Sequence, residues 1–352
     1  VCVCLLSVGS GMAQAQRSMT VDQLFSLIES GSNVLTAQKT GVDVASRAVE
    51  EAKSKRLPDI NASLSASYNG NVLMTDRDFS NAKGITQPHF GNTFALEAQQ
   101  VVYAGGAINS GIRLAELQKQ RSENAVQITR NQMRFVALGQ YLELMKLNNG
   151  IKVYDSNITL TAKLIDDIKS RQKQGMALKN DVTRYELQME SLRLGKRRLE
   201  DQKSIANHQL CNTLGLVDVN IQPDMDLEAI GDNLASEQLL LREAADFSPV
   251  LQQSAIDVKM AEQQLKLSKS ELLPKIAVVA ADNFAGPFTY DLPPIDKNFN
   301  IWYIGVGVKY SLSSLFKANK SVRRAKEQLR LSNTARSVAA ETVNNNMQQA
   351  YT

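Results

Sequence analysis

Four short segments of the chain show, to different degrees, the alternation of apolar and polar residues that is typical of β-strands with one apolar and one polar face. The alternation is less clean at 93–103 and weakest at 276–284, which is apolar on both faces at first. We predict strands at about residues 58–70, 93–103, 275–285 and 299–312. The first alternates without error from Ile60 to Tyr68, and small uncharged polar residues fill the intervening positions. In a soluble sheet such an apolar face needs a covering layer, yet the neighbouring segments are long helical stretches rather than covering helices.

Those helical stretches are unusually long. Residues 107–173 contain no proline and, if continuous, form a helix of about 67 residues and roughly 100 Å. Ile128, Phe135, Leu138, Leu142 and Met145 within it have the spacing of a coiled-coil seam. Gly175 interrupts the pattern, and residues 178–214 indicate a return helix. We therefore predict a long antiparallel hairpin over about residues 106–215.

The chain also resembles itself at an offset of 216 residues. Leu57-Pro58 recurs as Leu273-Pro274, and further matches in the same register extend from about residue 22 to residue 60. A proline disfavours helix at the residue before it, so Pro58 and Pro274 mark the change from helix to strand in both copies. We expect a first repeat at 18–217, a linker at 218–233, and a second repeat at 234–352 that stops within its long helix.

The start of the chain is apolar from Val1 to Met12 and continues with Ala13-Gln14-Ala15, a small-x-small cleavage pattern. We interpret residues 1–15 as the end of a secretory signal peptide, with a buried first strand or helix as the alternative. Once this segment is removed, Cys211 is the remaining cysteine, and we expect it to be a buried small hydrophobe. No other segment reaches about 18 uninterrupted apolar residues, the length of a membrane-spanning helix.

Composition narrows the function classes. The chain has 352 residues, 43% hydrophobic and 22% charged, which excludes a disordered protein and a bundle of membrane helices. A net charge of only +4 argues against a nucleic-acid binder. With two His and three Cys there is little from which to build a metal site or a catalytic triad. We therefore expect no enzyme and no cofactor, and we attribute the spacing of His208 and Cys211 to helix packing.

A lipid-facing barrel explains strands that lack a covering layer, because lipid covers the apolar face and water the polar face. The strand lengths fit the span of about 9–11 residues that a tilted transmembrane strand needs. Candidate residues of interfacial aromatic girdles are Tyr68, Trp302, Tyr303 and Tyr310, with ordinary sheet packing as the alternative. Since single-chain barrels begin at about eight strands, four strands per chain require several chains to share one barrel.

Two motifs complete the picture. The passage from the second strand to the long helix is Val102-Tyr103-Ala104-Gly105-Gly106, followed by Arg113-Leu114-Ala115, and the hairpin tip contains Gln174-Gly175-Met176. Together with the repeat, these features resemble the TolC family of outer-membrane efflux channels over about residues 18–352. The second copy lacks both junction glycines, and the tip departs from the family's Val-Gly-Leu core.

The resemblance implies a mainly α protein with membrane β-strands, made of two tandem repeats of helix, strand, strand and long helical hairpin. It implies a homotrimer whose α-barrel continues into a shared transmembrane β-barrel in the outer membrane, with a long periplasmic extension. It implies contact with outer-membrane lipid, a periplasmic adaptor protein, and through that adaptor an inner-membrane pump of the RND or ABC type.

The function implied by the resemblance is a passive conduit for drugs, small molecules or proteins. The adaptor-contact residues that it implies are Arg171, Gln174, Gly175, Met176, Ala177, Leu178 and Asp181. Tyr103, Gly105 and Gly106 would form the strand-to-helix junction. The alternatives are a periplasmic adaptor-like protein with one helical hairpin and a soluble coiled-coil scaffold. The repeated strand pair opposes the first, and the alternation from Ile60 to Tyr68 opposes the second.

Overall fold

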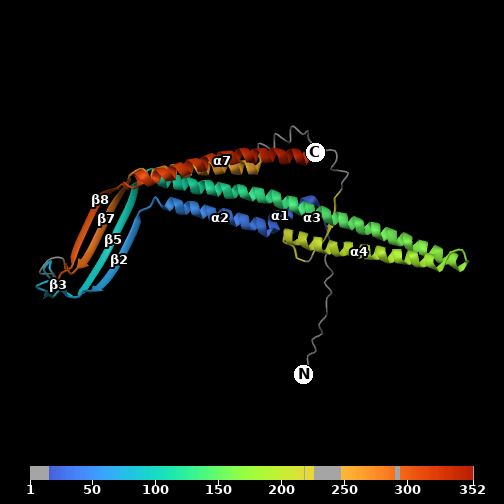
Figure 1. Ribbon diagram of the computed structural model, residues 1–352, viewed down its shortest axis with the longest axis horizontal. Helices are drawn as coiled ribbons and strands as arrows, with labels where there is room; N and C mark the ends of the chain where they lie inside the picture. Colours follow the sequence, from blue (N-terminus) through green and yellow to red (C-terminus); the bar gives the residue numbers. More distant parts are fainter. Residues whose placement is uncertain (1–15, 218, 226–246, 290–293, 352) are drawn as a thin grey trace, which may run out of the picture. The chain divides into compact units, whose positions relative to one another are not determined.

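The structure, a computed structural model, describes residues 16–217, 219–225, 247–289 and 294–351 (Figure 1). The predicted signal segment 1–15 and most of the predicted linker lie outside these residues. The chain forms two compact units, each built from two stretches of sequence. We call Val1–Gly41 with Glu123–Ala244 the hairpin unit, and Val42–Ser122 with Ala245–Thr352 the sheet unit.

The hairpin unit is dominated by two long helices. The helix α3 (Ala107–Lys173), which enters it at residue 123, is continuous over 67 residues, and α4 (Lys179–Leu214) returns antiparallel to it. Two ion pairs join the helices: Lys169 Nζ lies 2.7 Å from Glu186 Oε1, and Lys196 Nζ lies 2.6 Å from Asp155 Oδ1. From the first pair to the second, the residue number increases in α4 and decreases in α3. The two helices are therefore antiparallel, as expected of a hairpin.

The core of the hairpin unit gathers around a short parallel strand pair. The strand β1 (Gln16–Met19) pairs with β6 (Asn220–Pro223), which lies within the segment expected to be a linker. The helix α1 (Val21–Gly31) follows β1 and begins with a capping box between Thr20 and Gln23. Buried residues from all these elements and from α3 and α4 form one cluster: Met19, Leu24, Ile28, Ala137, Tyr141, Leu144, Leu210, Cys211, Leu214 and Ile221.

The sheet unit contains the four predicted long strands. In chain order they are β2 (Asp59–Tyr68), β5 (Phe90–Tyr103), β7 (Lys275–Gly286) and β8 (Phe299–Lys309). They form one antiparallel sheet in the order β2-β5-β7-β8 (Figure 1). A small hairpin of β3 (Val72–Met74) and β4 (Lys83–Ile85) lies in the connection between β2 and β5.

The element order of the sheet unit occurs twice. The helix α2 (Asn33–Ser54) precedes β2, and α6 (Pro249–Ser270) precedes β7; the bounds of these helices differ by the 216 residues of the sequence repeat. After the second strand of each pair a long helix begins, α3 in the first copy and α7 (Ser314–Tyr351) in the second. Pro58 and Pro274 stand between helix and strand as predicted.

The predicted coiled-coil seam of α3 is only partly buried within the chain. Within the chain, Phe135 of the expected coiled-coil seam is 79% exposed and Leu142 is also exposed, whereas Ala137, Tyr141 and Leu144 are buried. These three buried residues belong to the core cluster that α3 forms with α1, α4, β1 and β6. No helix in the described part of the chain has both the length and the apolar character needed to cross a bilayer.

Candidate functional site

The four-stranded sheet has one apolar face along its whole width. Cross-strand pairing places Ile60, Ala98, Ala280 and Ile304 in one row, so all four lie on the same face. We call this the apolar face; its other members include Ala62, Leu64, Tyr68, Phe90, Phe94, Leu96, Val278, Phe284, Trp302, Val306 and Val308. Many of these side chains are exposed in the chain, and Leu64 reaches 80%.

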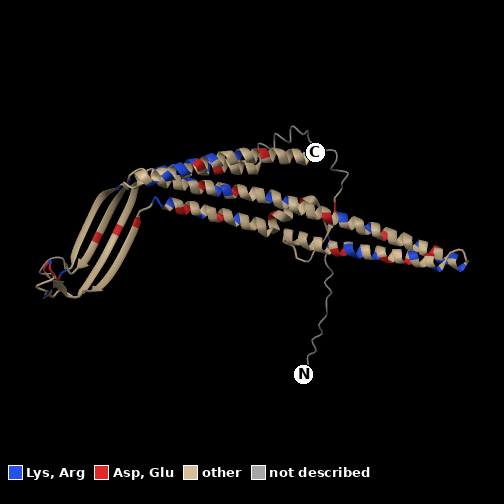
Figure 2. Cartoon of the chain, viewed as in Figure 1, with Lys and Arg blue, Asp and Glu red and all other residues tan. Residues whose placement is uncertain are grey.

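The opposite face, which we call the polar face, is polar in β2 and mixed in β7 and β8, where Val279, Phe299 and Ile301 also lie on it. It begins in β2 with Asn61, Ser63, Ser65 and Ser67, which are paired with Glu97, Ala95, Thr93 and Gly91 of β5. Charged residues are rare on the strands compared with the helices (Figure 2). Within the long strands they are Asp59, Glu97, Lys275, Asp282 and Lys309. Four of these five lie on the polar face, whereas Asp282 lies on the apolar face between Leu96 and Trp302.

The two outer strands of the sheet are open. β2 and β8 each have one hydrogen-bonded neighbour among the described residues, and nearly every residue of both strands is exposed. An open edge presents unpaired backbone N–H and C=O groups that bind another strand or water. Each edge of the sheet can therefore pair with a further strand.

The aromatic girdle candidates do not share one face. Tyr68 and Trp302 lie on the apolar face, whereas Tyr303, next to Trp302 in β8, lies on the polar face. Tyr68 lies at the loop end of the sheet, where its ring stacks on His89 at a centroid distance of 5.3 Å. Tyr310 follows the last residue of β8 at the helix end. A girdle on the apolar face therefore excludes Tyr303.

The strand-to-helix junction of the first copy packs against the corner of the second copy. Gly105 has φ of 61°, and a Cβ atom there would lie 2.8 Å from Leu273 Cβ and 2.9 Å from Ser270 O. Gly106 has φ of 84° with open space around it. Tyr103 pairs with Ile276 beyond a register shift that begins at Val101. The two glycines make the turn from β5 into α3, and Gly105 also permits the close approach to the residues before Pro274.

The hairpin tip is a compact five-residue turn between α3 and α4. Gly175 has φ of 78°, and the Met176 N–H donates to Arg171 O at 2.9 Å, which closes the end of α3. Asp181 Oδ2 accepts the Leu178 N–H at 3.0 Å and so caps the start of α4. Arg171 pairs with Asp167 at 2.9 Å. The side chains of Met176 and Leu178 are 69% and 72% exposed.

The tip thus brings the predicted contact residues together on one turn. Gln174 and Ala177 complete it, with Gln174 exposed and Ala177 partly buried. The sequence Gln174-Gly175-Met176-Ala177-Leu178 therefore forms a surface with two large apolar side chains, flanked by the charges of Arg171 and Asp181. Behind it, the hydrogen bond and charge of Glu186 raise the pKa of Lys169, and this pair links α3 to α4.

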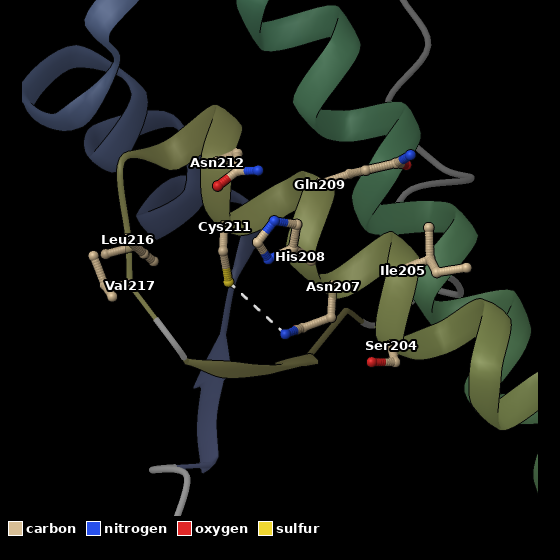
Figure 3. Close-up of a pocket in the computed structure, with 9 residues that line it drawn as sticks. All are labelled: Ser204, Ile205, Asn207, His208, Gln209, Cys211, Asn212, Leu216 and Val217. Carbon is tan, nitrogen blue, oxygen red and sulfur yellow. Dashed lines mark hydrogen bonds between the residues drawn. The ribbon is translucent and has the colours of Figure 1, made fainter.

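His208 and Cys211 line a recess of about 550 Å³ at the end of α4 (Figure 3). Cys211 is 2% exposed, and its thiol donates to Val219 O at 3.1 Å. Asn207 Nδ2 donates to Val219 O at 2.8 Å, and Asn207 Oδ1 accepts the Ile221 N–H at 2.9 Å. These contacts attach β6 to α4, as a structural role requires. Among the described residues no group of three or more His, Cys, Asp or Glu has the geometry of a metal site.

No protein-family model and no curated protein sequence matches the chain. Solved structures do match it. The outer membrane protein VceC of Vibrio cholerae is 14% identical, with a TM-score of 0.68 over 94% of this chain and 76% of VceC. The outer-membrane channel OprN is 15% identical, with a TM-score of 0.71 over 94% of this chain and 73% of OprN.

The CmeC outer membrane channel of Campylobacter jejuni is 14% identical, with a TM-score of 0.68 over 92% of this chain and 68% of CmeC. These proteins are channels and not enzymes. At such low identity the match concerns the fold, and it extends over nearly the whole chain. The chain therefore has the fold of the TolC-like outer-membrane efflux channels.

Proposed function

We propose that the chain is one subunit of an outer-membrane channel in a tripartite export system. Three copies would each contribute their four strands to one transmembrane β-barrel, and the long helices would continue it as an α-barrel into the periplasm. The open sheet with an exposed apolar face carries this proposal. The match to solved outer-membrane channels supports it.

The physical argument rests on the edges of the sheet. In lipid an unpaired strand edge leaves backbone groups without hydrogen bonds, at a cost of several kcal/mol for each group. Both β2 and β8 have such an edge within the described residues. Pairing β8 of one copy with β2 of the next removes every edge once the ring closes, and lipid then covers the apolar face.

The polar face would line the water-filled duct. Its serine, asparagine and glutamine residues can form hydrogen bonds with water. The proteins that share this fold are channels and not enzymes. A duct of this kind conducts passively, so the energy for export would come from an inner-membrane pump of the RND or ABC type. Drugs, small molecules or proteins are the proposed cargo.

The hairpin tip would be the contact with the periplasmic adaptor. Met176 and Leu178 expose apolar surface on a turn that is otherwise polar, and such residues are the usual anchors of an interface. Arg171 and Asp181 would supply polar contacts at the rim of the same surface. Junction residues Tyr103, Gly105 and Gly106 would keep the sheet and the first long helix in the geometry that the barrel needs.

Cysteine cross-linking between the strand edges tests the shared barrel. In a Cys211→Ser background, single cysteines on β2 (Ser63→Cys, Ser65→Cys) are combined with single cysteines on β8 (Tyr303→Cys, Gly305→Cys). Oxidation in purified outer membranes should give a covalent trimer on denaturing gels for at least one combination. The control pair Ala62→Cys with Leu96→Cys lies face to face within one chain and should give no intermolecular product.

The competing adaptor-like function predicts a different result. A chain recovered as a soluble periplasmic monomer, without trimer cross-links from any edge combination, would contradict the channel proposal. A cross-linked trimer that opens ion-conducting pores in planar bilayers is the result we expect.

A further inference from the structure

A recess of about 540 Å³ lies on the polar face of the sheet at its helix end. Its floor is the cross-strand pair of Ala277 and Gly307, where one methyl group and one glycine leave the space open. Val101, Leu273 and Val279 supply apolar walls. Every part of the recess belongs to the sheet unit.

Two lysines stand directly opposite each other at the rim of this recess. Lys275 of β7 and Lys309 of β8 are cross-strand partners, so both lie on the polar face and their Cβ atoms are about 4.5–5.5 Å apart. Like charges directly opposite each other on neighbouring strands destabilise a sheet. Neither lysine has an ion pair or a hydrogen bond from its ammonium group within the described residues.

The remaining polar groups of the recess do not neutralise this pair. Glu271 is the only acidic residue that lines the recess among the described residues, which leaves an excess of one positive charge. The Ser314 hydroxyl donates to Ser311 O at 2.6 Å, and the hydroxyls of Ser311 and Ser313 share a hydrogen bond of 2.9 Å. The Ser311 hydroxyl can therefore turn toward a ligand without leaving a buried group unpaired.

We propose that this recess binds an anionic amphiphile, a molecule with a compact oxyanion head such as a phosphate or carboxylate and a short apolar tail. The head lies between the ammonium groups of Lys275 and Lys309 and relieves their mutual repulsion. The tail lies over Ala277 and Gly307, against the side chains of Val101 and Val279. The arrangement concentrates charge at one end of the recess and apolar surface at the other, as such a molecule requires.

The site goes beyond the proposed function, although it fits it. If the polar face lines a duct, an exported anion or a lipid headgroup reaches the recess from the lumen. The channel proposal is tested by cross-linking and conduction, whereas this site is tested by ligand binding. A failure of one proposal can therefore be told apart from a failure of the other.

Octyl phosphate is the probe for the site. The purified full chain in a neutral maltoside detergent at low salt is titrated with octyl phosphate, inorganic phosphate and octyltrimethylammonium, and binding is followed by calorimetry and by the shift in Tm. We expect octyl phosphate to bind and raise Tm, inorganic phosphate to bind roughly tenfold or more weakly, and octyltrimethylammonium to have no effect.

Charge-removing variants separate the site from general surface charge. Lys275→Gln and Lys309→Gln should each weaken octyl phosphate binding about tenfold. Each should also raise the Tm of the unliganded protein, because the like-charge pair is gone. Lys326→Gln, which removes an exposed lysine from α7, is the matched control and should change neither value. Equal binding by the Lys275→Gln, Lys309→Gln and control variants would overturn the proposal.

Filling the floor of the recess tests the apolar half. A Cβ atom at Gly307 has no neighbour nearer than Ala277 O at 4.0 Å, so Gly307→Leu occupies the recess without a clash at its Cβ. This variant should lose the advantage of octyl phosphate over inorganic phosphate while retaining the weak binding of inorganic phosphate. Equal affinities of the unmodified chain for the two phosphates would show a site for free oxyanions and overturn the assignment to an amphiphile.

Discussion

Gly105, just before α3, lies against Leu273, just after α6. A Cβ atom on Gly105 would lie 2.8 Å from Leu273 Cβ, closer than such atoms approach in proteins. The backbone of Gly105 is also left-handed, with φ of 61°. The junctions of the two sequence repeats are thus in direct contact, and the glycine satisfies two requirements at once.

Gly105→Ala should therefore destabilise the protein by about 3 kcal/mol, from the left-handed backbone and the forced movement of Leu273 together. Chemical unfolding followed by circular dichroism measures this. Gly106→Ala is the matched control, because φ is 84° there but no atom lies within 4 Å of the added Cβ. It should cost only about 1 kcal/mol. Equal losses for the two variants would show that the contact with Leu273 is not important.

Tyr141 should be a measurable anchor of the hairpin unit. Its buried hydroxyl donates to Met19 O at 2.7 Å and accepts the Asp224 N–H at 2.8 Å. Tyr141→Phe should cost about 1–2 kcal/mol, because the Met19 carbonyl and the Asp224 amide retain only their own bond of 3.1 Å. Tyr185→Phe, at a half-buried tyrosine of α4, is the control and should be nearly neutral.

Tyr141 should also make the stability of the folded chain depend on pH. Burial raises the pKa of Tyr141 in the folded chain above its ordinary value of 10.0. Above that pH the unfolded chain loses the phenolic proton while the folded chain keeps it, so the stability that Tyr141 contributes is present below pH 10 and decreases as pH rises further. Between pH 8 and about 11, the unmodified protein should therefore lose more stability than Tyr141→Phe. Parallel pH profiles for the two proteins would contradict this assignment.

Much of the fold follows from local features of the sequence. Pro58 and Pro274 end helices because of sterics at the preceding residue, and Gly175 allows the turn at the hairpin tip. The four long strands follow from alternation, which requires only the period of the backbone. Each of these features lies within a few residues of the structure that it determines, so the local pattern of residues predicts it.

The pairing of β1 with β6 cannot be predicted from a local pattern. β1 and β6 are four residues each and pair in parallel across about two hundred residues of chain, so neither has a periodic pattern of useful length. Ala137, Tyr141 and Leu144 of α3 share a core cluster with these two strands. Tyr141 therefore lies in the core, while Phe135, which has good coiled-coil spacing, is exposed.

The faces of the aromatic candidates follow from alternation within each strand, because Tyr303 is next to Trp302 and so lies on the opposite face of β8. The pairing between strands is different. The opposition of Lys275 and Lys309 depends on the register between β7 and β8. The alternation of each strand predicts its two faces but not its partner residues, so this pair has no signal in the sequence.

The proposed contact between the hairpin tip and a periplasmic adaptor can be tested by adding charge to the tip. Met176→Asp and Leu178→Asp each replace an exposed apolar side chain by a charge, and they should abolish cross-linking to the adaptor and the export phenotype in cells. Stability should change by no more than about 0.5 kcal/mol, because neither side chain is buried. Gln174→Asp adds the same charge to the same turn without removing apolar surface, and it should retain function. Loss of function in Gln174→Asp to the same extent would assign the effect to charge and not to apolar contact.

Two neighbouring residues of β2 test which face of the sheet meets lipid. Leu64 lies near the middle of the strand on the apolar face, opposite Phe94, and Ser65 lies on the polar face opposite Thr93. If lipid covers the apolar face, Leu64→Lys places a charge near the bilayer midplane at a cost of about 2–4 kcal/mol, whereas Ser65→Lys points into water. Folding into outer-membrane vesicles, followed by protection from protease, should be strongly reduced for Leu64→Lys and unchanged for Ser65→Lys. The reverse order would mean that the polar face meets lipid, and equal behaviour would mean that neither face does.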